Sequence, residues 1–222
     1  MTYDPPSVRG PGGLAPTAAE PRSSPLPGGF GLDVGIAVFA AGRGSRFGGD
    51  DPKCLQEWQG RPLVTWALEA ALGSGLTPVL LVSGYRHREV DKAVPAGVDI
   101  VHNHHWKEGI ARSLRAALDA LDGYASIGAV CIGLADQPRV GAESYRRLAA
   151  AFGDGAQLAV ATYGGERGNP VLVARSLWSE AHELTGDVGA RVLMQRHPVV
   201  EVACDDTGSP VDVDTPGDLD NL

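Results

Sequence analysis

Cationic side chains alternate with glycines directly after the first strongly apolar run of the chain. That run covers residues 34–41, is β-branched at its start, and is typical of a buried strand in a mostly parallel sheet. Glycines let backbone N–H groups approach an anion, and nearby cations neutralise it. The pattern predicts a polyphosphate site, with a plain turn bearing solvated arginines as the alternative. The residues concerned are Gly42, Arg43, Gly44, Arg46, Gly48, Gly49 and Lys53.

Spacing excludes two familiar phosphate-binding motifs. Gly-x4-Gly-Lys-Ser/Thr is absent, and Gly42-x-Gly44 is followed by Gly48, one residue too late for Gly-x-Gly-x-x-Gly. A dinucleotide site also calls for an acidic residue at the end of the second strand, where this sequence has Ser83-Gly84-Tyr85. A hydride-transfer enzyme is therefore disfavoured, and an NAD(P)H-dependent oxidoreductase remains an alternative.

Three carboxylates are candidates for binding a metal. Asp136 follows the apolar run 129–134, and open α/β sheets bind ligands at the carboxyl ends of their strands. Asp212 and Asp214 flank Val213 in a predicted strand, where alternation puts both carboxylates on one face. If that face meets Asp136, three carboxylates converge, which suits Mg²⁺ bridging nucleotide phosphates. The alternative for Asp214 is a helix cap, a role that Thr215 already fills.

The histidines at 102, 104 and 105 are interpreted as no metal site, because no cysteine or carboxylate lies beside them at ligand spacing. Asn103 and Trp106 are more informative, since they precede Gly109 and a helix that carries Ser113. Together they would form a polar lip with an aromatic floor for a second substrate. A loop anchored by a buried tryptophan is an equally good interpretation.

Apolar periodicity predicts alternating strands and helices around these residues. Strands are expected over 34–41, 78–83, 98–101, 129–134, 158–162, 171–174, 199–203 and 211–213. Helices are expected over 61–75, 87–94, 110–121, 142–152, 177–184 and 188–196, with a short terminal helix after a capping box at Thr215-Pro216-Gly217-Asp218. This order predicts an α/β protein with a parallel or mixed sheet covered on both faces.

Length and composition fit one domain and a tail. Residues 1–32 hold 7 of the 16 prolines and 6 of the 30 glycines, and we predict that they are disordered, with the folded domain over 33–222. The formal net charge of −8 argues against a general nucleic-acid-binding protein. Three cysteines at unrelated spacings suggest neither a disulfide framework nor a zinc motif. We expect a cytoplasmic protein that does not associate with membranes.

Taken together, the motifs resemble those of the MobA-like nucleotidyltransferases, and within them the molybdenum cofactor cytidylyltransferase branch. They follow the family's order from residue 34 to the end, and this sequence departs from the usual residue at Phe47, Asn169 and Gly217. The matching segments are residues 40–48, Pro52-Lys53, Gly60-Arg61-Pro62-Leu63, Asn103-x-x-Trp106-x-x-Gly109-x-x-x-Ser113-Leu114, Leu134-Ala135-Asp136-Gln137-Pro138, Gly168-Asn169-Pro170, Gly186-Asp187-x-Gly189-Ala190-Arg191 and Asp212-Val213-Asp214-Thr215-Pro216.

The resemblance implies a Rossmann-like three-layer fold with a mostly parallel sheet of about seven strands, one of them antiparallel. It implies transfer of CMP from CTP to a phosphorylated acceptor, molybdopterin cofactor, with Mg²⁺ and release of pyrophosphate. A molybdoenzyme or its chaperone stands as the candidate protein partner. GTP as the nucleotide, or a different phosphorylated acceptor, is the alternative within this class.

The resemblance also assigns roles to residues. The triphosphate would be held by Lys53, Arg46 and Arg43, and the base and ribose would meet the backbone of Ala40, Ala41, Gly42, Arg43 and Gly44. Mg²⁺ would be held by Asp136, Asp212 and Asp214. The acceptor pocket would be lined by Asn103, Trp106, Ser113, Asn169 and Asp187.

Overall fold

The computed structural model describes residues 33–44, 47 and 50–222. The predicted tail over 1–32 and the predicted phosphate ligand Arg46 lie outside the described residues. No helix in the described part of the chain is long and apolar enough to cross a membrane.

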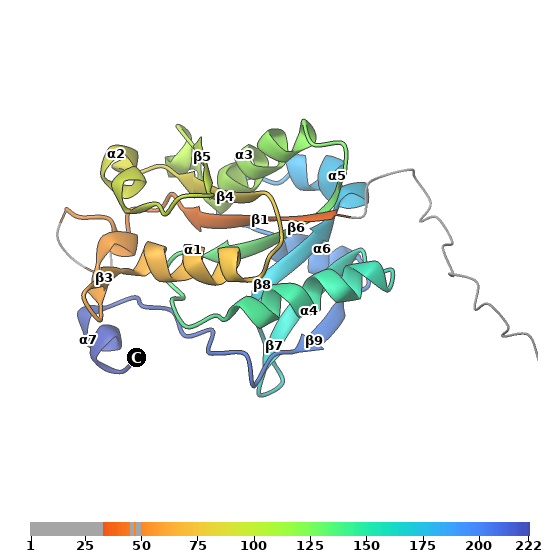
Figure 1. Cartoon of the computed structure of the whole chain (residues 1–222). Helices are drawn as coiled ribbons and strands as arrows, with labels where there is room; N and C mark the ends of the chain where they lie inside the picture. The colour runs from red at the N-terminus through yellow and green to blue at the C-terminus, as the bar shows by residue number, and fades with distance from the viewer. Residues whose placement is uncertain (1–32, 45–46, 48–49) are drawn as a thin grey trace, which may run out of the picture.

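Strands and helices alternate along the chain, as the periodicity predicts (Figure 1). The strands are β1 (Asp33–Ala40), β2 (Glu57–Trp58), β3 (Arg61–Pro62), β4 (Val79–Ser83), β5 (Asp99–His102), β6 (Ile127–Leu134), β7 (Leu158–Tyr163), β8 (Glu166–Ala174) and β9 (Val200–Ala203). The α-helices are α1 (Leu63–Gly73), α2 (His87–Val90), α3 (Ile110–Asp122), α4 (Ala142–Gly153), α5 (Trp178–His182), α6 (Arg191–Arg196) and α7 (Pro216–Asp220). Short 3₁₀ turns cover Lys53–Leu55, Asp91–Ala93, Trp106–Glu108 and Arg175–Leu177.

The main sheet has seven strands in the order β5-β4-β1-β6-β8-β7-β9. Strand β8 runs antiparallel to both of its neighbours, and the remaining pairs are parallel. The predicted mostly parallel, seven-stranded α/β fold with one antiparallel strand is confirmed. From β1 the chain builds outward through β4 to β5 and then returns to place β6 on the other side of β1. The carboxyl ends of β1 and β6 therefore flank the switch point at which such sheets bind ligands.

Helices cover both faces of the sheet and make it a three-layer structure. Helices α1 and α4 pack on one face, and α3, α5 and α6 pack on the other (Figure 1). Alternate side chains of β1 enter the two cores: Ile36 and Val38 face α1, whereas Ala37 and Phe39 face α3. Burial on both faces explains why this strand reads as a continuous apolar run.

Two hairpins depart from the predicted elements. The predicted helix over 61–75 begins only at Leu63, because Arg61 and Pro62 pair with Trp58 and Glu57 across a two-residue turn with positive φ at both positions, Gln59 and Gly60. The predicted strand 171–174 is longer, because Gly164 and Gly165 supply a second turn of this kind between β7 and β8.

The C-terminal segment also differs from the prediction. Residues 211–213 form no strand, so that prediction is wrong, although the segment is held against the body of the protein. The Val213 amide donates to the Asp136 carbonyl at 3.0 Å, and the Val213 side chain is fully buried with Leu63 and Phe47. The predicted capping box of the terminal helix is confirmed, with Thr215 and Asp218 as its members. These contacts fix the segment that carries Asp212 and Asp214.

Candidate active site at the carboxyl ends of β1 and β6

The chain turns through Gly42, Arg43 and Gly44 after β1, and we call this segment the glycine turn. The two residues before it are buried. Ala40 and Ala41 are 6% and 5% exposed, and the Ala41 carbonyl accepts a hydrogen bond from the Tyr85 amide at 3.0 Å. None of the described residues lies within 4 Å of the position that a Cβ would take on Gly42. The base- and ribose-binding role expected here stays a prediction.

Gly44 is required by the conformation of the turn. Its φ is +67°, which L-residues with side chains rarely adopt, and a Cβ at this position would collide with the Cβ of Lys53. The close approach places the turn against the stem of the lysine. Of the two predicted arginines, Arg43 is described: it lies half-exposed, pairs with Asp50 at 3.3 Å and stacks near Tyr85.

Lys53 brings together carboxylates from two distant segments. Its Nζ contacts the Asp136 carboxylate directly and lies 2.7 Å from Oδ1 of Asp214. The Lys53 and Asp136 side chains are 15% and 21% exposed, and that of Asp214 is 38% exposed. The sequence analysis places Lys53 on the phosphates and the aspartates on the metal. In the structure, these three residues form one ion-paired group.

The third aspartate lies beside this group. The Gln137 side chain, 4% exposed, donates from Nε2 to Asp212 Oδ1 at 2.9 Å and to the Pro210 carbonyl at 2.8 Å. Its Oε1 is buried without a hydrogen-bond partner among the described residues. Gln137 therefore positions Asp212, a role that sequence reasoning missed even though the residue stands next to Asp136.

The electrostatics of the group follow from burial and charge. Burial alone lowers the pKa of Lys53, but the neighbouring Asp136 and Asp214 outweigh it, so the pKa is raised and the ammonium is held in its charged form. Burial, and then the charge of Asp136, raise the pKa of Asp212 despite the Gln137 hydrogen bond and the Lys53 charge. Lys53 is thus held in its charged form, whereas the charged form of Asp212 is disfavoured.

The donor set suits a hard divalent cation, because all three predicted ligands offer carboxylate oxygens. Asp136 and Asp214 already share one cation, the ammonium of Lys53. The three aspartates are, however, too far apart to hold one ion as they stand, because their nearest oxygens do not all lie within 4.8 Å of one another. Among the described residues, one other group of side chains does meet this spacing. The residues present thus fit Mg²⁺ chemically, with a rearrangement of Lys53.

The predicted acceptor residues fall into two sets. Asn103 and Ser113, each 4% exposed, hydrogen-bond to one another at 3.1 Å and so hold the loop before α3. Trp106 packs edge-on against Tyr85 with ring centroids 5.2 Å apart. Neither Asn103, Trp106 nor Ser113 lines the large cavity of the described chain. Their side chains shape the loop around it.

Asn169 and Asp187 do line that cavity, which has a volume of about 790 Å³. Its lining includes Phe39 and Leu134, near the carboxyl ends of β1 and β6, and Arg191 contributes a cation. The two sets of predicted acceptor residues are linked through the backbone. Gly109, with a φ of +99°, lies so close to Gly186 and Asp187 that a Cβ would collide with their backbone atoms.

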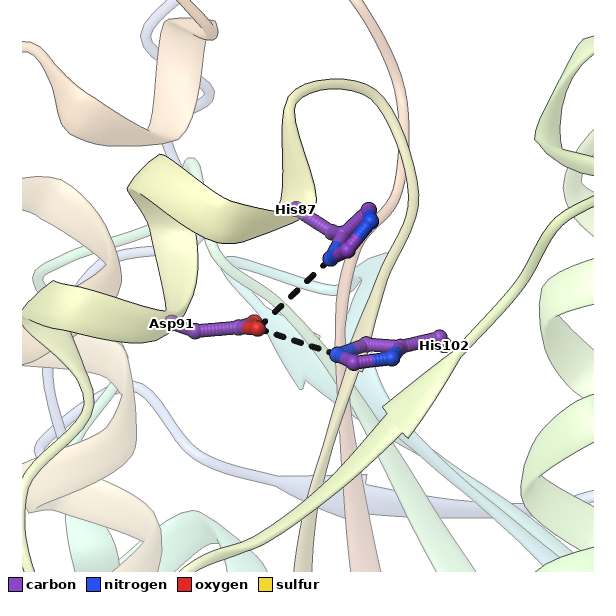
Figure 2. A group of neighbouring side chains, drawn as sticks. All are labelled: His87, Asp91 and His102. Carbon is purple, nitrogen blue, oxygen red and sulfur yellow. Dashed lines mark hydrogen bonds and ion pairs between the residues drawn. The ribbon is translucent and has the colours of Figure 1, made fainter.

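The reason given for excluding a metal at the histidines, the lack of a carboxylate partner, does not hold in the structure. His102 does have a carboxylate partner, since its Nε2 lies 3.0 Å from Oδ2 of Asp91, and His87 faces the same oxygen at 3.7 Å (Figure 2). These three residues form a group whose ligand atoms all lie within 4.8 Å of one another. The spacing of His87 and Asp91, four residues apart on a helical turn, was the signal available in the sequence.

Fold and site together define an α/β protein with a lysine–carboxylate group after the carboxyl end of β6, beside the switch point of its sheet. The chain belongs to the MobA-like NTP transferase domain family, whose model matches residues 36–202. It is accordingly a nucleotidyltransferase of this family.

Individual relatives agree with this placement. The bifunctional protein GlmU of Trichlorobacter lovleyi is 35% identical over 115 residues, which cover 51% of this chain and 24% of that protein. The match therefore spans about a quarter of the length of that relative. The crystal structure of Rv0371c from Mycobacterium tuberculosis H37Rv superposes with a TM-score of 0.75 at 31% identity, covering 86% of this chain and 97% of that one. A structure of Rv0371C in complex with manganese has a TM-score of 0.72 at 29% identity, covering 86% and 97% of the two chains.

Proposed function

We propose that this protein is a Mg²⁺-dependent cytidylyltransferase that moves CMP from CTP to a phosphorylated acceptor, molybdopterin cofactor, with release of pyrophosphate. The observation that carries the proposal is the Lys53–Asp136–Asp214 group, in which Lys53 also lies against Gly44 of the glycine turn. The family, and the manganese in the complex of the relative Rv0371C, support a divalent metal.

The reaction balances without covalent catalysis. An oxygen of the acceptor's terminal phosphate attacks the α-phosphorus of CTP, the Pα–O–Pβ bond breaks, and its electron pair leaves with pyrophosphate. Such a reaction needs the two phosphates in line and their charge neutralised. We assign neutralisation of the triphosphate to Lys53, Arg43 and Arg46. Cys54 is 5% exposed beside Lys53, and burial raises its pKa, so it is no nucleophile.

Asp136 and Asp214 would hold the metal, with Asp212 oriented by Gln137. A bound Mg²⁺ supplies neutralisation of charge on the phosphate oxygens. Lys53 now pairs with the same two carboxylates; if these held a metal, the Lys53 ammonium would be available to the phosphates.

The cavity of about 790 Å³ lined by Asn169 and Asp187 is the proposed acceptor pocket. Its apolar floor suits a ring system, while Arg191 and Asn169 supply a cation and an amide for an anionic, hydrogen-bonding acceptor. Asn103 and Ser113 act by fixing the neighbouring loop. The methyl of Ala41, where the GTP-using branch usually carries glycine, favours CTP over GTP.

A pyrophosphate-release assay tests the proposal. CTP, GTP, UTP and ATP are each combined with molybdopterin, glucose 1-phosphate, 2-phospholactate and glycerol 3-phosphate, with and without Mg²⁺. We expect release from CTP and molybdopterin only when Mg²⁺ is present, and loss of turnover in Asp136→Ala with retention in the surface variant Lys92→Ala.

Each alternative has its own readout. A preference for GTP, or for a sugar or alcohol phosphate, would replace the proposed substrates while keeping the reaction. Absence of release from every pair, together with NADPH oxidation, would favour the oxidoreductase. Near wild-type release by Asp136→Ala would contradict the metal assignment.

A further inference from the structure

We propose that His87, Asp91 and His102 form a second metal site, specific for a transition metal such as Zn²⁺ and separate from the aspartates of the active site. Figure 2 shows the three side chains pointing toward one another from the start of α2, the following 3₁₀ turn and the end of β5. The proposal does not depend on the nucleotidyl-transfer reaction.

The spacing of the ligand atoms is that of a metal site. Zn²⁺ bonds nitrogen and carboxylate oxygen at about 2.0–2.2 Å, so two ligands of a tetrahedral ion lie roughly 3.3 Å apart. The observed separations bracket this value: Asp91 Oδ2 lies 3.0 Å from His102 Nε2 and 3.7 Å from His87 Nδ1. Small side-chain rotations would therefore complete the first coordination sphere.

An unsatisfied atom points into the site. His87 Nδ1 is buried and has no hydrogen-bond partner among the described residues, although it faces the Asp91 carboxylate. A simple ion pair would be expected to close the 3.7 Å gap to hydrogen-bonding distance. A metal between the three side chains would instead give this nitrogen a ligand bond, which accounts for its orientation and its lack of a partner.

The carboxylate is held from behind, as metal ligands usually are. Ser83, fully buried at the end of β4, donates from Oγ to Asp91 Oδ1 at 3.2 Å. That bond leaves Oδ2 to face the two imidazoles. The site is also reachable from solvent, because the side chains of His87, Asp91 and His102 are 33%, 24% and 37% exposed.

The donor set identifies the class of metal. Two imidazole nitrogens and one carboxylate oxygen suit Zn²⁺, Co²⁺, Ni²⁺ or Cu²⁺, whereas Mg²⁺ and Ca²⁺ prefer oxygen ligands only. Three protein ligands leave at least one position to water. His104 stays outside the proposed set, since its ring centroid lies 6.4 Å from that of His87 and 6.2 Å from that of His102.

A bound metal would restrict the motion of the segment that leads into Asn103 and the proposed acceptor loop. The site joins the turn after β4 to the last residue of β5, and Asn103 follows directly, with its amide donating to the Ser83 carbonyl at 2.7 Å. A cation here would add a link between two segments that already meet through the β4–β5 pairing and the Asp91–His102 contact.

Titration with Co²⁺ in the presence of saturating Mg²⁺ tests the proposal, because Mg²⁺ fills the oxygen-ligand site and leaves the nitrogen-ligand site open. Visible absorption of the bound Co²⁺ reports on its ligands, and calorimetry gives the affinity. We expect one Co²⁺ site that excess Mg²⁺ does not displace and that Zn²⁺ does. His102→Ala should weaken binding more than about 100-fold, and Ser83→Ala by roughly tenfold, since outer partners cost 10–100-fold.

His105→Ala is the matched control, because this exposed imidazole in the same loop pairs with Glu108 instead. It should leave Co²⁺ affinity unchanged, and Asp136→Ala should do the same. Circular dichroism checks the folding of each variant, and Asp91→Asn replaces His102→Ala if the latter is unfolded. Equal Co²⁺ affinity in wild type and in the folded ligand variants, or loss of the Co²⁺ signal when Mg²⁺ is added, would overturn the proposal.

Discussion

Replacement of Lys53 by alanine should change Mg²⁺ affinity and turnover in opposite directions: Mg²⁺ should bind more tightly and turnover should fall. The variant therefore separates the metal-binding role of the active-site charges from their catalytic role. In the structure the Lys53 ammonium sits on the Asp136 and Asp214 carboxylates, which are the proposed metal ligands. A divalent cation must therefore compete with the lysine for the same oxygens. Removing the lysine removes this competitor for the two carboxylates.

The size of the effect follows from the geometry. Two unit charges 2.7 Å apart, the distance from Lys53 Nζ to Asp214 Oδ1, attract by about 6 kcal/mol at an effective dielectric constant of about 20. Desolvation of the lysine and the 38% exposure of Asp214 reduce the net coupling to about 1–2 kcal/mol. We therefore expect Mg²⁺ to bind Lys53→Ala about tenfold more tightly, equivalent to 1.4 kcal/mol. Turnover should still fall by at least about 10²–10³-fold, since a charged donor to the triphosphate is lost.

Calorimetric titration with Mg²⁺ measures the first effect and pyrophosphate release the second. Lys92→Ala is the control for loss of a surface lysine, and Lys53→Ala/Asp214→Asn should lose the gain in affinity. Weaker Mg²⁺ binding by Lys53→Ala, or unchanged turnover, would refute the reasoning.

The same ion pairs make stability depend on pH. The pKa of Lys53 lies above its ordinary 10.5, so the contribution of Lys53 to the stability of the fold is present at neutral pH and is lost as pH rises through the pKa of the folded state.

Two further predictions concern residues next to this lysine. Gly44→Ala should lower the free energy of unfolding, measured by urea titration, by about 1–3 kcal/mol. Alanine is strained at a φ of +67°, and its Cβ would collide with the Cβ of Lys53. An unchanged urea midpoint would argue against this turn conformation. Burial, helped by the Asp136 charge, raises the pKa of Cys54 to about 12, so iodoacetamide at pH 8 should label the native protein slowly at this residue, and faster as pH approaches 12. Mass spectrometry of the labelled peptide, with the unfolded chain as control, measures it, and rapid labelling at pH 8 would contradict the buried environment.

Much of the fold is predictable from the sequence because most elements are specified locally. The apolar run of β1 and the helical face of α3 carry their periodicity in the chain, and the structure reproduces both within one or two residues. The hairpins were missed because their signal is a two-residue turn. Gln59-Gly60 is a weaker indicator than Asn-Gly, and the arm that follows is only Arg61–Pro62.

The active-site group was predictable in part. Asp136 stands at the end of an apolar strand, so a position at the ligand-binding edge follows from sheet geometry. The strand predicted over 211–213 is not formed; the segment is held instead by the Val213 contacts and by hydrogen bonds from Gln137 to Pro210 and Asp212. That Lys53 would pair with the aspartates could not be foreseen, because no local pattern relates residues so far apart in sequence.

The group of His87, Asp91 and His102 was missed in the sequence for the same reason. A search for ligands near His102 in sequence fails, because Asp91 reaches it only after β4 and β5 pair and bring the intervening turn over the end of β5. Parallel pairing puts the ends of β5, β4, β1 and β6 at one edge of the sheet, so Ser83, His102 and Asp136 all follow from a single topology. That edge carries carboxylates alone at the β1–β6 switch and imidazoles with one carboxylate at β4–β5. Hard and borderline cations prefer different donors, so the two clusters should select different metals although they share one edge.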